Sequence, residues 1–312
     1  MKYESGDLAV CFTCGTQFDA PLSSPPDSCR ICDDPRQYQP PTGQAWTSLN
    51  ECSAVQKNKF TTDDADPRIH YITTKPKVAA ELPPGLADST TTRKQLGIGQ
   101  RSILIQAPTG NVLWDIIAFI DDATVDFVKS KGGLKAIVIS HPHFWTTHLE
   151  WARIFACPVY LCKEDEEWVN RADEKGVRKW ITETRELDEV QGMTAIVAGG
   201  HFDGSMMLHW EDKLFIADTM MSVPSGLYHH NRLPGTISFS FMWAYPNMIP
   251  LPPNKVHWIW KAIKPFSFVT TYGGFPGQNV TRKDLKAQVL ESMKIFLRMA
   301  GHEKAAVYEE AL

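Results

Sequence analysis

The 312-residue sequence contains 43% hydrophobic and 22% charged residues, proportions typical of a soluble globular protein. Its 36 acidic and 32 basic residues give a net charge of −4, which argues against a nucleic-acid-binding surface or a polybasic membrane patch. No apolar run approaches the roughly 20 residues that span a bilayer, and the first residues show no secretory signal. We therefore expect a cytoplasmic protein without membrane or nucleic-acid partners.

Four of the seven cysteines form two CxxC pairs, Cys11 with Cys14 and Cys29 with Cys32. In a reducing compartment such pairs bind metal more often than they form disulfides, and two pairs complete a tetrahedral zinc site. The flanking residues are mostly polar, Gly or Pro, which argues against four ordinary core cysteines. Residues 1–45 are therefore predicted to form a zinc-ribbon module that needs its metal to fold. Its few basic residues favour a structural or docking role.

Residues 46–95 carry repeated Pro, Gly, Ser and Thr and show no sustained hydrophobic period. We expect this connecting segment to have little regular structure and to pack over the main domain. The main domain is placed at residues 96–312.

From Gly97 onward, apolar β-branched runs alternate with turn signals and helical patterns. This order predicts an α/β (α+β) architecture of two sheets packed face to face, with helices outside. Strand hairpins are predicted over 101–107 with 111–115 and over 205–210 with 213–219, and single strands over 136–139, 158–162, 195–201 and from 269. Helices are predicted over 124–133, 149–156 and 164–176. A last helix is predicted from a Thr281 capping box to Gly301.

Histidines follow the apolar run 136–139 directly, as His141, Pro142 and His143. A His-x-His sequence at a strand end places two imidazoles in one turn, and neutral imidazole is the commonest zinc ligand among side chains. Pro142 stiffens the turn. Two polar side chains without a ligand would be the ordinary alternative, but the further candidates downstream favour a metal site.

Two more candidate ligands end apolar strands, His201 in GGHFDGS and Asp218 in LFIADT. Alone, His201 could be a core histidine and Asp218 a turn residue. Together with His141 and His143 they form a credible set of ligands for zinc, and an acceptable one for iron or manganese.

The order of these pieces, from the ILIQAPTGNVLWD hairpin through SHPH and GGHFDGS to LFIADT, resembles the metallo-β-lactamase fold superfamily. The resemblance covers roughly residues 97 to 275. It implies an αββα sandwich, with a metal site at the edges of the sheets, and hydrolysis as the commonest chemistry.

Three positions depart from the motif of that superfamily. Trp145 and Thr146 stand where its His-x-His-x-Asp-His motif has aspartate and histidine, and Tyr272 stands near its last histidine. The resemblance assigns those three groups to a second metal, so we expect one ion in this site. His148 could be a ligand or a proton donor, or a helix-start histidine without a role. Tyr272 could line the site or merely pack.

These observations predict a mononuclear metallohydrolase that cleaves a small lactone, lactam or ester. Asp218 would orient the attacking water, and His148 or Tyr272 would protonate the leaving group. A degenerate metal-binding scaffold and an iron oxidoreductase are the alternatives, and a homodimer is left open. The aromatic candidates for the substrate pocket are Phe144, Trp145, Phe202 and Tyr228.

Overall fold

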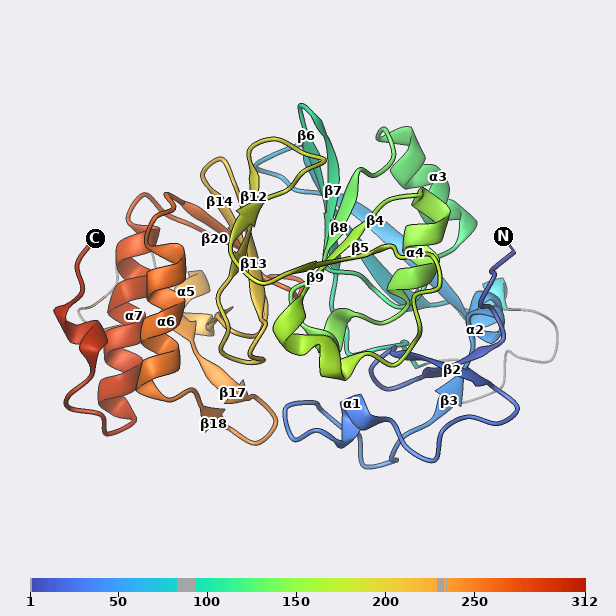
Figure 1. Cartoon of the computed structure of the whole chain (residues 1–312), viewed down its shortest axis with the longest axis horizontal. Coiled ribbons are helices and arrows are strands. Elements are labelled where there is room, and N and C mark those ends of the chain that lie inside the picture. The colour runs from blue at the N-terminus through green and yellow to red at the C-terminus, as the bar shows by residue number, and fades with distance from the viewer. Residues whose placement is uncertain (1, 83–93, 229–232, 234) are drawn as a thin grey trace. The chain divides into compact units, whose positions relative to one another are not determined.

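The computed structural model describes residues 2–82, 94–228, 233 and 235–312 (Figure 1). The chain divides into two compact units. The first comprises Met1–Leu161 and Glu167–Lys179, and the second comprises Cys162–Glu166 and Trp180–Leu312. Among the described residues, every helix is too short or too polar to cross a membrane.

The first unit begins with a small antiparallel sheet of three strands, in the order β2-β1-β3. These strands are β1 (Leu8–Cys11), β2 (Gln17–Pro21) and β3 (Trp46–Thr47), and the one-turn helix α1 (Arg30–Asp33) follows β2. Because β3 pairs with β1, the small sheet extends just past the predicted module boundary at residue 45. The division into domains stays a prediction.

A sheet of seven strands forms the body of the first unit. Strands β4 to β7 pair antiparallel, whereas β7, β8 and β9 run parallel to one another. In spatial order the strands are β10 (Arg178–Ile181), β9 (Val159–Cys162), β8 (Ala136–Val138), β7 (Gly110–Trp114), β6 (Ser102–Ala107), β5 (Ile69–Pro76) and β4 (Gln56–Thr62). The predicted hairpin of β6 and β7 is confirmed.

The connecting segment 46–95 has more regular structure than the sequence suggested, so that expectation is wrong. It contains the helix α2 (Leu49–Val55), the strands β4 and β5, and the single turn η1 (Ala79–Glu81). Polar residues dominate β4 because it is the edge strand, and only pairing with β5 makes it a strand. Residues 83–93 of the segment lie outside the described part.

Two of the three helices predicted before residue 180 form. In α3 (Asp122–Ser130) the side chain of Asp121 accepts a hydrogen bond from the Thr124 amide at 2.8 Å, as a capping residue should. The second is α4 (His148–Phe155), which follows the short turn η3 (Pro142–Phe144). The predicted helix over 164–176 is wrong: only η4 (Lys163–Trp168) forms there. The Asp165 carboxylate is drawn inward by the Gly204 amide at 2.7 Å, a long-range contact that the local pattern does not reveal.

The second unit has a six-stranded sheet in which β14 and β19 are parallel neighbours. The hairpin of β13 and β14 across Glu211 and Asp212 is confirmed. In spatial order the strands are β11 (Arg185–Glu186), β12 (Met193–Val197), β13 (Met206–Trp210), β14 (Lys213–Phe215), β19 (Thr270–Tyr272) and β20 (Val280–Thr281).

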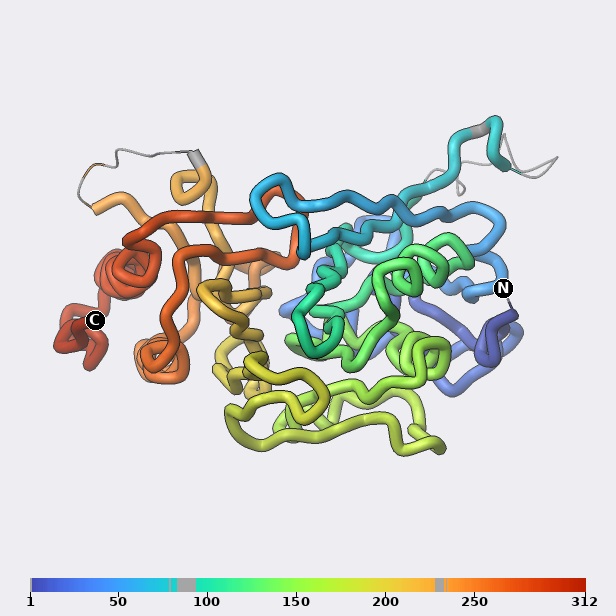
Figure 2. Tube along the Cα trace, turned by 90° about the horizontal axis from the view of Figure 1, so that it is seen from above, coloured from blue at the N-terminus to red at the C-terminus, as the bar shows by residue number. Residues whose placement is uncertain are grey.

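Helices α6 (Pro253–Ile263) and α7 (Leu285–Met299) lie on the same side of this sheet (Figures 1 and 2). Their buried apolar faces share one core with β12 and β14. The predicted capping box at Thr281 is wrong, because Thr281 pairs in β20 and α7 begins after Asp284. The smaller elements are β15 (Met221–Ser222), α5 (Pro224–Tyr228), β16 (Phe239–Ser240), β17 (Met242–Ala244), β18 (Ile249–Pro250) and η5 (Ala306–Glu309).

Candidate metal centres

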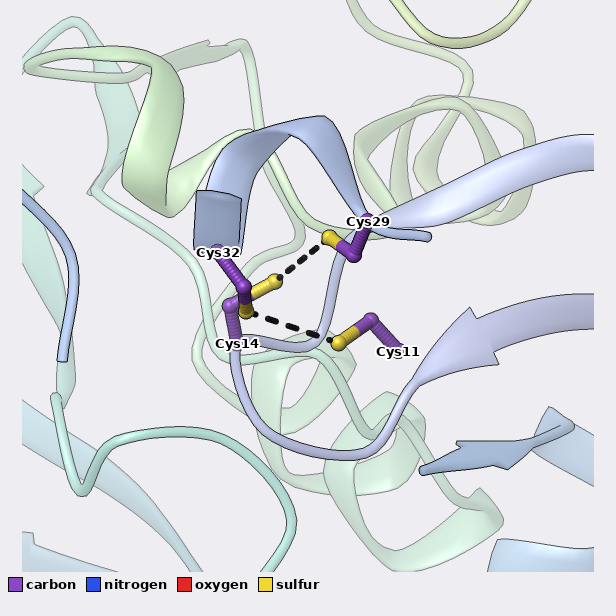
Figure 3. A group of neighbouring side chains, drawn as sticks. All are labelled: Cys11, Cys14, Cys29 and Cys32. Carbon is purple, nitrogen blue, oxygen red and sulfur yellow. Dashed lines mark hydrogen bonds between the residues drawn. The ribbon is translucent and has the colours of Figure 1, made fainter. Parts of the chain in front are cut away.

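The four cysteines of the two CxxC pairs converge in the first unit (Figure 3). Cys11 ends β1, and Cys14 lies in the loop after it. Cys29 directly precedes α1, and Cys32 lies within it. All four side chains are buried, and the Sγ atoms of Cys11 and Cys32, and of Cys14 and Cys29, lie 3.6 Å apart. The sequence-predicted ligands are therefore brought together.

This cluster fits a tetrahedral cation. Zinc–sulfur bonds of about 2.3 Å place the sulfurs of such a site about 3.8 Å apart, close to the observed spacing. Burial raises the pKa of the Cys14 thiol, because an isolated thiolate is costly in a low-dielectric interior. A divalent cation would offset that cost, and the three-stranded sheet with its four cysteines has the arrangement of a zinc ribbon.

A second pair of candidate ligands stands at the end of β8. His141 has an extended backbone, and Pro142 opens the η3 turn, so the chain turns sharply between the two histidines. The rings of His141 and His143 have centroids 5.0 Å apart, and one ring nitrogen of each lies within 4.8 Å of the other. Both side chains are buried. The predicted His-x-His turn therefore aims two imidazoles at a common point.

Neighbouring polar groups orient His141. The Oγ atom of Ser140 lies 2.8 Å from Nδ1 of His141, and the Ser140 amide donates to Oδ1 of Asp115 at 2.7 Å. Asp115 directly follows β7 and has a φ of 53°, and its side chain is fully buried. Sequence reasoning missed Ser140 and Asp115 as functional residues. An aspartate directly after the apolar strand NVLW was the available signal.

The second unit holds the other two candidates. Gly199 and Gly200 have φ values of 63° and 104°, and they turn the chain so that the His201 amide donates to Thr219 Oγ1 at 3.1 Å. Nδ1 of His201 lies 3.3 Å from the carbonyl oxygen of Met242, while its Nε2 lies 3.9 Å from Oδ2 of Asp218. A hydrogen bond at Nδ1 is the usual partner arrangement of a histidine that coordinates through Nε2.

Burial raises the pKa of Asp218 to about 7. A cation beside this carboxylate would lower that pKa again, because it stabilises the charged form. Tyr245 lies close by, with its ring centroid 6.3 Å from that of His201. Burial, and the charge of Asp218, raise the pKa of Tyr245 far above its ordinary value, so its phenol stays protonated.

His148 uses both ring nitrogens within the first unit. Nδ1 lies 2.8 Å from the Trp145 carbonyl oxygen, and Nε2 accepts a hydrogen bond from Arg178 Nε at 2.9 Å. Burial, together with the charge of Arg178, lowers the pKa of His148 to about 3. This geometry favours the structural alternative for His148. Tyr272, the other predicted proton donor, is buried and its ring stacks on Phe215 at 5.0 Å.

Three predicted pocket aromatics are buried, and each packs against a histidine. The ring centroids of Phe144 and His141 are 4.6 Å apart, those of Phe202 and His201 are 5.3 Å apart, and those of Trp145 and His148 are 6.4 Å apart. The rings therefore hold imidazoles in place and present little surface. The fourth, Tyr228, ends α5, and its side chain lies outside the described residues.

No family model matches the chain. It is 33% identical over 299 residues to the uncharacterized protein YmaE of Bacillus subtilis (strain 168), covering 94% of this chain and 97% of YmaE. Among solved structures, DIM-1 metallo-β-lactamase superposes with a TM-score of 0.51 at 12% identity, over 78% of this chain and 99% of DIM-1. A metallo-β-lactamase from Hirschia baltica gives a TM-score of 0.44 at 16% identity, over 77% of this chain and 97% of that one. The identity to YmaE shows that the chain belongs to the family of YmaE, and the superposition on DIM-1 shows that it has the metallo-β-lactamase fold, preceded by a zinc-ribbon module.

Proposed function

We propose that the chain is a metal-dependent hydrolase whose ion is bound by His141, His143, His201 and Asp218. One observation carries this proposal. Nδ1 of His141 is hydrogen-bonded to Ser140 Oγ, and Nδ1 of His201 is hydrogen-bonded to the Met242 carbonyl oxygen. Because Nδ1 is engaged in both rings, Nε2 is the atom through which each would coordinate.

Three imidazoles and one carboxylate suit zinc, and iron or manganese are alternatives. A divalent ion bound there supplies a Lewis acid and a water molecule that ionises near neutral pH. Asp218 would orient that water by accepting a hydrogen bond from it. Because a bound cation would lower the pKa of Asp218 again, this carboxylate would be ionised and able to accept a hydrogen bond at neutral pH.

We propose a small uncharged substrate, such as a lactone, a lactam or an ester. The groups beside His201 include the rings of Phe202 and Tyr245, the Met242 carbonyl and the Asp218 carboxylate, and these four offer no positive charge to a phosphate. A phosphodiester would need cationic side chains around the reacting phosphate. A cytoplasmic location, and the oligomeric state, stay predictions.

The test is elemental analysis combined with a hydrolysis screen. We expect two ions per chain in the wild type, one ion in a Cys11→Ser variant and one in a His143→Ala variant. A panel of lactones, lactams and esters should show turnover that Asp218→Ala reduces at least about a hundredfold. Iron at the histidine site with redox turnover would favour an oxidoreductase, and a bound ion without turnover of any substrate would favour a scaffold.

A further inference from the structure

We propose that the zinc-ribbon module positions the loop that carries His141 and His143, and so acts as an internal support for that loop. We call residues 14–17 the knuckle loop and residues 140–148 the histidine loop. Both belong to the first unit. The effect of this support on metal binding rests on the proposed function. The contact between the module and the loop does not depend on that function.

Gly15 lies close to both Ala118 and the histidine loop. Its φ is +85°, and a Cβ atom added there would lie 2.5 Å from the Cβ of Ala118 and 3.4 Å from Cγ2 of Thr146. Only glycine allows the backbone to come this close, since any side chain would push the knuckle loop away from both neighbours. Ala118 is in turn tied to the histidine loop, because its carbonyl accepts a hydrogen bond from Thr147 Oγ1 at 2.7 Å.

A backbone hydrogen bond joins the two loops directly. The Gln17 amide donates to the Thr146 carbonyl oxygen at 3.3 Å. Arg171 fixes Gln17 from the other side, with Nη1 donating to Gln17 Oε1 at 2.7 Å and Nε donating to Asp19 Oδ1 at 3.0 Å. The knuckle loop is thus held against the histidine loop by a hydrogen-bonded frame.

Thr146 needs such external support. It is a β-branched residue with a φ of +32°, a conformation that costs free energy and persists only where surrounding contacts hold it. Its side chain is only 4% exposed. The N-terminal residues add a second contact at the start of α4, where Ser5 Oγ donates to Glu150 at 2.6 Å. The module therefore contacts the histidine loop at Thr146 and the first turn of α4 at Glu150.

The module makes a further contact within the first unit. The two arginines near the cysteines are also engaged within the first unit, with the guanidinium carbons of Arg30 and Arg36 lying 5.1 and 5.0 Å from the ring centroid of Trp168. Arg30, Arg36 and the Gly15 turn therefore contribute to an intramolecular interface.

The test compares three variants. Gly15→Ala forces the knuckle loop away from Ala118, and Gly15→Ala/Ala118→Gly removes the colliding Cβ and restores the space. Gly43→Ala is the matched control, because Gly43 has a φ of +75° with no atom within 4 Å of an added Cβ. It imposes similar backbone strain without displacing anything. Should Gly15→Ala not fold, Arg171→Gln replaces it, because it removes the ion pair with Asp19. Its control is Arg185→Gln, which removes an exposed ion pair with Asp188.

Two measurements are made with zinc retained at the cysteines. Hydrogen exchange follows the Trp145 and His148 amides, which bond to carbonyls at 3.2 and 3.0 Å. We expect Gly15→Ala to speed their exchange at least about tenfold. Chelator competition gives the dissociation constant of the ion at the histidines, which we expect to rise about tenfold or more. The double variant should restore both values, and Gly43→Ala should change neither.

Unchanged exchange in Gly15→Ala, or a double variant that fails to restore it, would overturn the support role. If the wild type binds no ion at the histidines, the proposed function fails, and the exchange measurement alone decides the inference. Faster exchange with an unaltered dissociation constant would overturn the link to metal binding.

Discussion

Arg178 Nε donates a hydrogen bond to His148 Nε2 at 2.9 Å, so this buried histidine is an acceptor and must be neutral. Its other nitrogen faces the Trp145 carbonyl oxygen at 2.8 Å, which requires a proton on Nδ1. The tautomer follows from these two partners. A histidine in this state stabilises the loop that precedes α4.

The first prediction concerns pH. The pKa of His148 is lowered to about 3 in the folded protein, against about 6.5 when unfolded, so only the unfolded chain binds this proton between those values. Stability from His148 is therefore fully present above pH 6.5 and is lost as pH falls towards 3. At pH 5 the loss is about 2 kcal/mol. In His148→Gln, urea unfolding should show a free energy that falls less between pH 8 and pH 5 than in the wild type. Parallel pH curves for the two proteins would contradict this assignment.

The second prediction concerns removal of the ribbon's metal. All seven cysteines are buried, and burial raises the pKa of both Cys52 and Cys162 to about 11. With zinc bound, a thiol reagent should find no fast-reacting cysteine, and after chelation it should find four. Because the four ligands hold the module together, chelation should also lower the thermal midpoint. Reaction of Cys52 and Cys157 as well after chelation would mean that the whole first unit has unfolded.

The third prediction tests the group that orients His141. Ser140→Ala removes the Oγ atom that lies 2.8 Å from Nδ1, so the ring is held less firmly. We expect metal affinity at the histidine site to fall by about 10- to 100-fold while the cysteine site keeps its ion. Ser130→Ala, which removes a hydroxyl that bonds only a backbone carbonyl on the exposed side of α3, is the control. An unchanged dissociation constant in Ser140→Ala would show that this contact does not orient the ring.

The fourth prediction tests the turn before His201. An added Cβ on Gly200 would lie 2.1 Å from Thr219 Oγ1, the atom that accepts the His201 amide. Gly200→Ala should therefore destabilise the chain by about 3 kcal/mol or more and weaken metal binding. Gly192→Ala has a comparable φ of +78° and open space around it, so it should cost only about 1 kcal/mol. Equal losses in urea unfolding would show that backbone strain, and not Thr219, decides the outcome.

Local patterns were sufficient for several parts of this protein. Two CxxC pairs predict a four-thiolate site because each pair makes its own tight turn, whatever the rest of the chain does. The hairpin of β6 and β7 is equally local. The His-x-His turn is too, because His141 and His143 are adjacent to the strand that aims them.

The features that the sequence did not predict depend on contacts between residues far apart in the chain. The segment of β4 is polar and becomes a strand only through pairing with β5. Thr281 pairs with Thr270 in β20 and therefore does not begin a helix. The role of His148 depended on Arg178, thirty residues away, and the fit of the ribbon depended on Gly15 meeting Ala118. The sequence by itself determined which residues can bind metal, since that is a property of side-chain type and local spacing. Only the tertiary structure decided which nitrogens are already engaged and which loops hold one another, because burial and long-range hydrogen bonds arise from packing.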